Sequence, residues 1–252
     1  MLVGFLAAFG IATVTAPVGV SGAVFLLPVQ LSVLHVPNPS VTPTNLLYNV
    51  VAGPGALLSY ARRGSLASPL ARRLVVATVP GVVVGAALRV HVVSGPGAFR
   101  LIAAVVLLAI GVWLIRRTLA PAAYRPMSDR TVSVLALGVG VIGGIYGIGG
   151  GSILGPILVG SGMTMAVVAP AALLSTFAAS LVGAVAFSLL ALTSSQPVAP
   201  EWSIGIACGL GGILGGYLGA RLQPRLPERA LRLLLGSLAV LVGLLYAVQS
   251  LP

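Results

Sequence analysis

Long apolar stretches that contain almost no charged residues limit the fold of this chain more than any other feature. Each stretch is close to or above the roughly 20 residues that a helix needs to cross a bilayer. The stretches are too long for the strands of a membrane barrel and lack their alternation. Only 7% of the residues are charged, against roughly 25% in a soluble domain. The sequence therefore predicts an all-α integral membrane protein with eight apolar stretches, at residues 2–34, 44–61, 70–90, 98–118, 131–160, 164–193, 202–220 and 229–250.

The two halves of the chain resemble each other around one polar loop. Glycine, proline and arginine residues recur at offsets of 127 to 132 residues, and paired prolines and arginines are uncommon coincidences in this composition. The sequence predicts a first repeat over 1–120, a linker over 121–130 and a second repeat over 131–252. The aligned pairs include Gly19 with Gly147, Gly22 with Gly150, Pro28 with Pro156, Pro43 with Pro170, Arg89 with Arg221 and Arg100 with Arg232.

The first stretch of each half is too long for a single crossing. As one helix, residues 2–34 would extend about 50 Å and residues 131–160 about 45 Å, against a hydrocarbon core of about 30 Å. Each contains a glycine- or proline-bearing break, near 16–22 and near 147–151, and each half-segment is too short to cross alone. A helix that enters, turns at the break and returns satisfies both constraints. Unwound backbone at that depth requires surrounding protein or a water-filled cavity.

The arginines support these re-entrant hairpins. If every stretch crossed the membrane once, the arginines would divide almost evenly between the two sides. With the first and fifth stretches re-entrant, 12 of the 14 lie on one side, and only Arg89 and Arg100 lie opposite. The positive-inside rule favours the second arrangement and puts the arginine-rich side in the cytoplasm. Three true spans per half make the repeats inverted, in a multi-pass cytoplasmic-membrane protein with both termini outside.

The two breaks are the best candidates for a binding site. Glycine allows the backbone to turn without a side-chain clash, and N–H groups at the start of a half-helix attract anions. Interrupted segments at matching positions of two repeats indicate a transporter site. The alternative is helix packing, which we favour for Gly211, Gly215 and Gly219. The predicted substrate-binding residues in the breaks are Val18, Gly19, Ser21, Gly22, Gly147, Gly149, Gly150, Gly151 and Ser152.

A second polar group lies just inside the second and sixth stretches, where Thr44, Asn45 and Asn49 are expected to face Ser175 and Thr176. Buried amides and hydroxyls are costly unless they are paired. Asn45 and Asn49 are one helical turn apart and share a face. They serve either as substrate ligands or as interhelical hydrogen bonds. The predicted site includes Asn45, Asn49, Ser175 and Thr176.

Several chemistries have no residues to support them. The acidic residues lie in or beside loops, so neither a carboxylate proton relay nor a cage for a hard cation is expected within the membrane. Cys208 is a packing residue, and His35 and His91 are interfacial. No cofactor, metal site, enzyme or ATP-driven pump is predicted, because no catalytic set or nucleotide motif occurs. Nucleic-acid binding is not expected, because the arginines are not interleaved with aromatic residues. The acidic residues are Asp129, Glu201 and Glu228.

The glycine-rich segment GVIGGIYGIGGGSILGP (140–156) resembles the signature of the TauE/SafE sulfite-exporter family of membrane permeases. The segment PVGVSGAVFLLP (17–28) lies where the first copy of that signature belongs, and RRG (62–64) and GGYLGARL (215–222) are also similar to the family. The resemblance covers nearly the whole chain. The first copy departs from the pattern, since Val20 and Ser21 replace glycines and TNL (44–46) stands where TSL is common.

The resemblance implies a secondary transporter of a small, often sulfur-containing anion such as sulfite, sulfoacetate, thiosulfate or a similar organosulfonate. Two alternatives stay open: a membrane subunit or scaffold without transport of its own, and a carrier of another small solute. The expected partners are the substrate anion and membrane lipid, and a homo-oligomer is left open.

Overall fold

A computed structural model describes residues 1–92, 96–120, 127–192 and 198–250, and these ranges contain helices and turns but no strand. This confirms the all-helical fold, and the helices begin and end within a few residues of the predicted stretches. The helices are α1 (Leu2–Thr15), α2 (Ala23–Ser32), α3 (Val41–Ala61), α4 (Pro69–His91), α5 (Pro96–Leu119), α6 (Asp129–Tyr146), α7 (Gly151–Gly160), α8 (Met165–Ala191), α9 (Trp202–Leu222) and α10 (Glu228–Ser250), with short 3₁₀ turns η1 (Ala16–Val18) and η2 (Gln223–Arg225).

The outer surface of the bundle is apolar, as a protein dissolved in lipid requires. Val76, Leu189 and Val248 are each at least 60% exposed, and contiguous apolar surface of this kind is rare on soluble monomers. Within the described residues, five helices are long and apolar enough to cross a membrane, namely α4, α6, α8, α9 and α10. The chain is a multi-pass membrane protein.

Of the six predicted spans, α3 and α5 are not among these five helices of the described chain, whereas α6 is. At 18 residues, α6 would extend about 27 Å, so the expectation that each half-segment is too short to cross alone was wrong for α6. Conversely, α3 has 21 residues but is not among the five apolar helices. The reason is its buried polar side chains, which include Thr42, Asn45 and Asn49. These side chains lie inside the bundle and not toward lipid.

Most of the described arginines lie at one end of the bundle. At this end Arg63 donates to the carbonyl of Ala220 at 2.7 Å, and Arg73 pairs with Asp129, which brings the ends of α3 and α9 close to the starts of α4 and α6. Arg232 donates to the carbonyl of Val159 at 3.1 Å, so α7 ends here as well. Arg89 lies in the last turn of α4, away from this end. Arg125 is outside the described residues.

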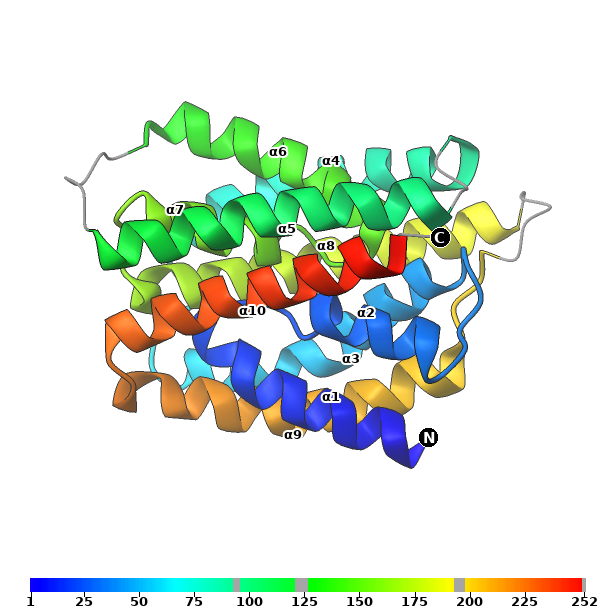
Figure 1. The fold of residues 1–252 in the computed structure, drawn as a ribbon, viewed down its shortest axis with the longest axis horizontal. Helices are drawn as coiled ribbons and strands as arrows, with labels where there is room; N and C mark the ends of the chain where they lie inside the picture. The colour runs from blue at the N-terminus through cyan, green and yellow to red at the C-terminus, as the bar shows by residue number, and fades with distance from the viewer. Residues whose placement is uncertain (93–95, 121–126, 193–197, 251–252) are drawn as a thin grey trace.

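The two broken segments return to the end from which they start (Figure 1). The hairpin of α1 and α2 opens toward the end that holds both termini, and the hairpin of α6 and α7 opens toward the arginine-rich end. Equivalent helices of the proposed repeats make equivalent pairs, because α1 packs on α9 as α6 packs on α4, and α3 packs on α9 as α8 packs on α4. These pairings support the inverted relation of the repeats, which stays a prediction.

Glycines hold the hairpins close to their neighbouring helices. A Cβ atom at Gly211 would lie 2.1 Å from the carbonyl oxygen of Phe5, and one at Gly215 would lie 2.2 Å from that of Phe9. Gly219 makes the same approach to Thr13, at 2.3 Å. The packing interpretation of this glycine series is therefore right, since no side chain fits between α9 and α1.

Candidate functional site

The first break turns at Gly19, directly after η1. Gly19 has a φ of +72° in the left-handed region, which residues with a Cβ adopt only with strain. A Cβ there would also lie 2.4 Å from the Cα of Ala169 on α8. Ser21 then caps the start of α2, because its Oγ accepts from the N–H of Ala23 at 3.1 Å. Both the turn and the cap are fixed by residues that the sequence places in the break.

The second break contains three glycines with positive φ values. Gly147 ends α6 with a φ of +72°, and the N–H of Ile148 donates back to Gly143 at 3.1 Å, as in a glycine C-cap. Gly149 and Gly150 have φ values of +71° and +73°. The N–H of Gly151 donates to the carbonyl of Gly149 at 2.8 Å, so Gly150 occupies the centre of a γ-turn. This backbone path favours glycine at each of these turns.

The two breaks meet inside the bundle through polar groups. The N–H of Ser21 donates to the Oγ of Ser152 at 3.1 Å, and the hydroxyl of Ser21 donates to the side-chain oxygen of Asn49. The amide nitrogen of Asn49 donates to the carbonyl of Gly147 at 3.3 Å and to the hydroxyl of Ser180 at 3.1 Å. Asn49 therefore joins both breaks to α8. Sequence reasoning missed Ser180, although it lies one helical turn after Thr176 on the same face.

The remaining predicted polar residues do not face one another as expected. Asn45 donates to the carbonyl of Ala23 at 3.0 Å, and its side-chain oxygen has no partner in the described part of the chain. Ser175 pairs at 2.8 Å with Thr78 on α4, so it does not reach α3. Thr44 accepts from the N–H of Glu201 at 2.8 Å and ties the starts of α3 and α9. Ser175 therefore lies on the side of α8 that packs on α4, whereas Asn49 and Thr176 line the same cavity, which is described below.

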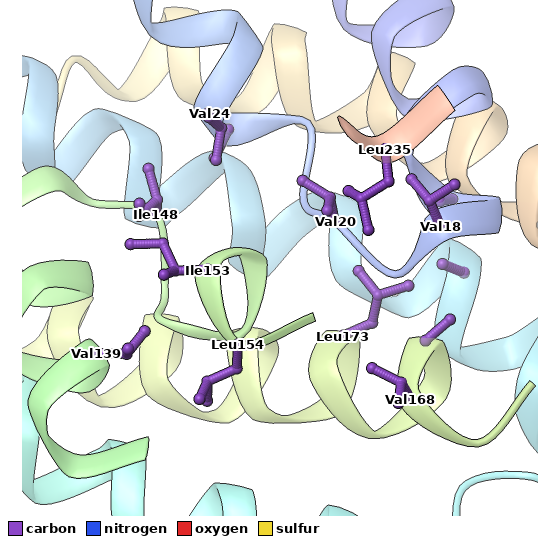
Figure 2. Packing of buried hydrophobic residues seen from close by; sticks show 14 of the residues in the cluster. Val18, Val20, Val24, Val139, Ile148, Ile153, Leu154, Val168, Leu173 and Leu235 are labelled. Carbon is purple, nitrogen blue, oxygen red and sulfur yellow. The ribbon is translucent and has the colours of Figure 1, made fainter. Parts of the chain in front are cut away.

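Apolar side chains of the breaks form part of the hydrophobic core. Figure 2 shows Val18 and Val20 beside Leu235 of α10, and Ile148 close to Ile153. Val18 is fully buried in this cluster, so its side chain packs and does not line the cavity described next. The breaks therefore pack against the hydrophobic core through their apolar side chains, and their polar groups bond to one another.

A cavity of about 40 Å³ lies next to the first break, between α1, α3, α8 and α9. Of the predicted residues, Ser21, Gly22, Asn49 and Thr176 line it. The predicted residues of the second break do not line it, namely Gly147, Gly149, Gly150, Gly151 and Ser152. The described residues that line the cavity carry no charge, and most of its remaining wall is small: Ala12, Ala16, Ala52, Gly53, Ala56, Gly212 and Gly216.

Two hydroxyls of this cavity wall have no hydrogen-bond partner in the part of the chain that the structure describes. The Oγ1 atoms of Thr15 and Thr176 are buried, and within the described residues neither one is paired. A buried hydroxyl without a partner is costly, and such groups often indicate an unbound ligand or a functional site. Sequence reasoning included Thr176 but missed Thr15. The available signal was its position as a polar residue at the end of an apolar helix, two residues before Pro17.

Arg89 lies deeper than its predicted place at the end of a stretch would suggest. Its side chain is fully buried, and it donates to the hydroxyl of Thr42 at 3.2 Å and to the side-chain oxygen of Asn38. Thr42 in turn donates to the carbonyl of Ile145 at 3.2 Å. Arg89 thus connects the start of α3 to the tip of the second hairpin, which only the tertiary structure could reveal.

Two glycine-broken helical hairpins that meet inside the bundle through Ser21, Asn49 and Ser152, with a cavity beside the first break, define a class, the membrane transporters built around discontinuous helices. Within that class the chain belongs to the sulfite exporter TauE/SafE family, whose profile matches residues 4–246. The match confirms the resemblance of the glycine-rich segments. No curated protein matches the chain, and no solved structure does.

Proposed function

We propose that this chain is a secondary transporter that moves a small, sulfur-containing anion across the cytoplasmic membrane. Sulfite, thiosulfate, sulfoacetate and similar organosulfonates are the candidate substrates. The observation that carries the proposal is the buried, uncharged cavity at the first break, in a chain of the sulfite exporter TauE/SafE family. The arginine-rich end is proposed to face the cytoplasm and both termini the outside, by the positive-inside rule.

The groups around the cavity suit an anion better than a cation. An ion that leaves water needs compensating polar groups, and the unpaired hydroxyls of Thr15 and Thr176 can donate to it. No carboxylate lines the cavity among the described residues. Asp129 and Glu228 instead pair with Arg73 and Arg232 at the arginine-rich end. A metal cation would find no hard oxygen cage here.

The hydrogen bonds of the breaks suit a protein that must change conformation. Asn49 and Ser152 connect the first break to the second, so a movement of one hairpin is transmitted to the other. Because the donors around the cavity are uncharged, we propose weak binding and ready release of the anion. Movement of one hairpin against the rest of the bundle would then expose the cavity alternately to each side.

Uptake into proteoliposomes tests the proposal. The purified full-length protein is reconstituted, and uptake of sulfite, thiosulfate, sulfoacetate and chloride is measured with and without a pH gradient. We expect saturable uptake of at least one sulfur-containing anion. Gly151→Val should abolish it, because even a Cβ at this position would lie 2.0 Å from the carbonyl oxygen of Ala172. The exposed Arg225→Gln variant is the control and should transport normally. Absence of anion uptake by a folded wild-type protein would contradict the proposal.

A further inference from the structure

We propose that the cavity beside the first break is a monoanion site: it accepts a small, singly charged oxyanion and discriminates against dianions. The proposal rests on the proposed transport function and goes beyond it by assigning the charge of the transported species and two of its ligands. Those ligands are the hydroxyls of Thr15 at the end of α1 and Thr176 on α8.

The two threonines are placed as ligand donors. Thr15 is 1% exposed and Thr176 is 3% exposed, both line the cavity, and neither Oγ1 atom has a partner in the described part of the chain. A third hydroxyl lies close by, since a Cβ at the cavity-lining Gly22 would be 2.3 Å from the Oη of Tyr48. Tyr48 also lines the cavity. An oxyanion would accept from these hydroxyls and remove the cost of leaving them unpaired.

The other polar side chains of the cavity wall are already engaged. The hydroxyl of Ser21 donates to Asn49 and accepts from the N–H of Ala23. The side-chain nitrogen of Asn49 donates to Gly147 and Ser180. These groups hold the two breaks together, so the hydroxyls of the two threonines and Tyr48 are the donors left for a ligand.

The dimensions of the cavity limit the ligand to a few heavy atoms. One water molecule occupies roughly 10–15 Å³ of cavity volume measured in this way. The cavity of about 40 Å³ therefore holds the equivalent of about three waters. This is the scale of a small inorganic oxyanion. The walls formed by Ala12, Ala52, Ala56 and Gly212 come from three different helices, so an enlarged ligand would have to move helix backbones.

The charge of the ligand follows from the absence of any charged group in the described cavity wall. The idealised cost of moving an ion out of water rises with the square of its charge, so a dianion costs about four times as much as a monoanion. A cationic side chain in contact with the ligand would offset that cost, but the lining offers only uncharged donors. The hydrogen sulfite form of sulfite satisfies both the size and the charge limits. Thiosulfate and sulfoacetate are dianions at neutral pH, so the monoanion site selects hydrogen sulfite among the candidate substrates of the proposed function.

Competition and pH dependence test the charge of the transported species. Sulfite uptake into proteoliposomes is measured at equal inner and outer pH, with nitrate as a competing monoanion and sulfate as a competing dianion. We expect nitrate to inhibit at a concentration at least ten-fold lower than sulfate. Uptake at a fixed, subsaturating total sulfite concentration should fall about ten-fold per pH unit above the second ionisation of sulfurous acid. Equal inhibition by sulfate, or uptake that follows the sulfite dianion, would overturn the proposal.

Matched threonine variants test the two ligands. Thr15→Val and Thr176→Val keep the side-chain shape and remove the hydroxyl, and each should raise the half-saturating hydrogen sulfite concentration about ten-fold. Thr15→Ser, which retains a hydroxyl, should stay within a few-fold of wild type. Thr13→Val is the control, because its hydroxyl donates to Phe9 of its own helix at 2.8 Å and does not line the cavity.

The outcomes separate this inference from the proposed function. Each variant is compared as a monodisperse protein by size-exclusion chromatography. If a valine variant does not fold, the alanine variant at the same position, which also removes the hydroxyl, provides the test and should show the same rise of about ten-fold. Wild-type uptake of sulfite together with valine variants that behave like Thr13→Val would refute the monoanion site and leave the transport function intact. A folded wild-type protein that moves none of the anions would refute both.

Discussion

Replacing Gly150 by alanine is expected to destabilise the protein through backbone strain alone. Gly150 has φ +73° and ψ −48° at the centre of the γ-turn that joins Gly149 and Gly151. A side chain there has room, because the nearest atom to an added Cβ is the Cα of Gly140 at 3.4 Å. Strain in such a sparsely populated region costs about 1–3 kcal/mol. The structure therefore supports the turning role that the sequence predicted for the glycines of the breaks.

The neighbouring Gly151→Ala variant tests steric overlap without backbone strain. Gly151 is the first residue of α7 and its φ lies outside the left-handed region. An added Cβ would lie 2.0 Å from the carbonyl oxygen of Ala172 and 2.4 Å from the hydroxyl oxygen of Thr176. The backbone of α8 cannot retreat without repacking, so overpacking should cost about 1–3 kcal/mol or more. Because Thr176 lines the cavity, this variant should also reduce transport.

Gly155→Ala completes the set as the matched control. It lies one turn further along α7, and the nearest atom to its added Cβ is the carbonyl oxygen of Gly19 at 3.8 Å. With neither strain nor clash, alanine should stabilise the helix by about 0.5–1 kcal/mol. All three exchanges add the same methyl group to one short segment, so differences among them report its surroundings.

The assay is the free energy of unfolding by reversible denaturation in mixed micelles, measured together with sulfite uptake in proteoliposomes. The expected order of stability is Gly155→Ala above wild type, and Gly150→Ala and Gly151→Ala below it. A Gly150→Ala protein as stable as Gly155→Ala would show that the γ-turn carries no strain. A stable, fully active Gly151→Ala protein would refute the close approach of α7 to α8.

Three further predictions follow from the polar network, the carboxylates and the topology. Asn49→Leu should destabilise the protein by about 1–3 kcal/mol, because it leaves buried partners in both breaks unpaired, and it should raise the half-saturating substrate concentration; a variant with wild-type unfolding and transport would contradict the network. Neutral amides at all three carboxylates should preserve most transport, since surface ion pairs contribute only about 0–1 kcal/mol; abolished uptake by a well-folded triple variant would show that a carboxylate is essential. In a background without the native cysteine, single cysteines are introduced at Ala67, Leu226 and Val33. Those at Ala67 and Leu226 should react with a reagent on the cytoplasmic side, and the one at Val33 with a reagent on the outside. Labelling of Ala67 and Leu226 on opposite faces would exclude the inverted repeats. The three carboxylates are Asp129, Glu201 and Glu228.

The sequence alone determined the class of the protein and the positions of its breaks. Helix and break positions could be predicted because the scarcity of charge and the length of the apolar stretches are local properties. Gly19 and Gly147 were predictable as turning points, since a positive φ depends on the residue itself and its neighbours. The arginine distribution also anticipated the two ends of the bundle.

Only the tertiary structure decided which polar groups form hydrogen bonds within the protein and which remain available to a ligand. Asn49 and Thr176 looked equivalent in sequence, yet one joins the two breaks and the other has an unpaired hydroxyl. The sequence marked Thr15 only as a polar residue at the end of an apolar helix, and its place in the cavity wall was decided when α1 packed against α3, α8 and α9. Hydrogen-bond pairing across helices depends on their relative rotation and depth, which no local pattern records. For the same physical reason the burial of Arg89 and the register of Ser175 became visible only when the helices were packed.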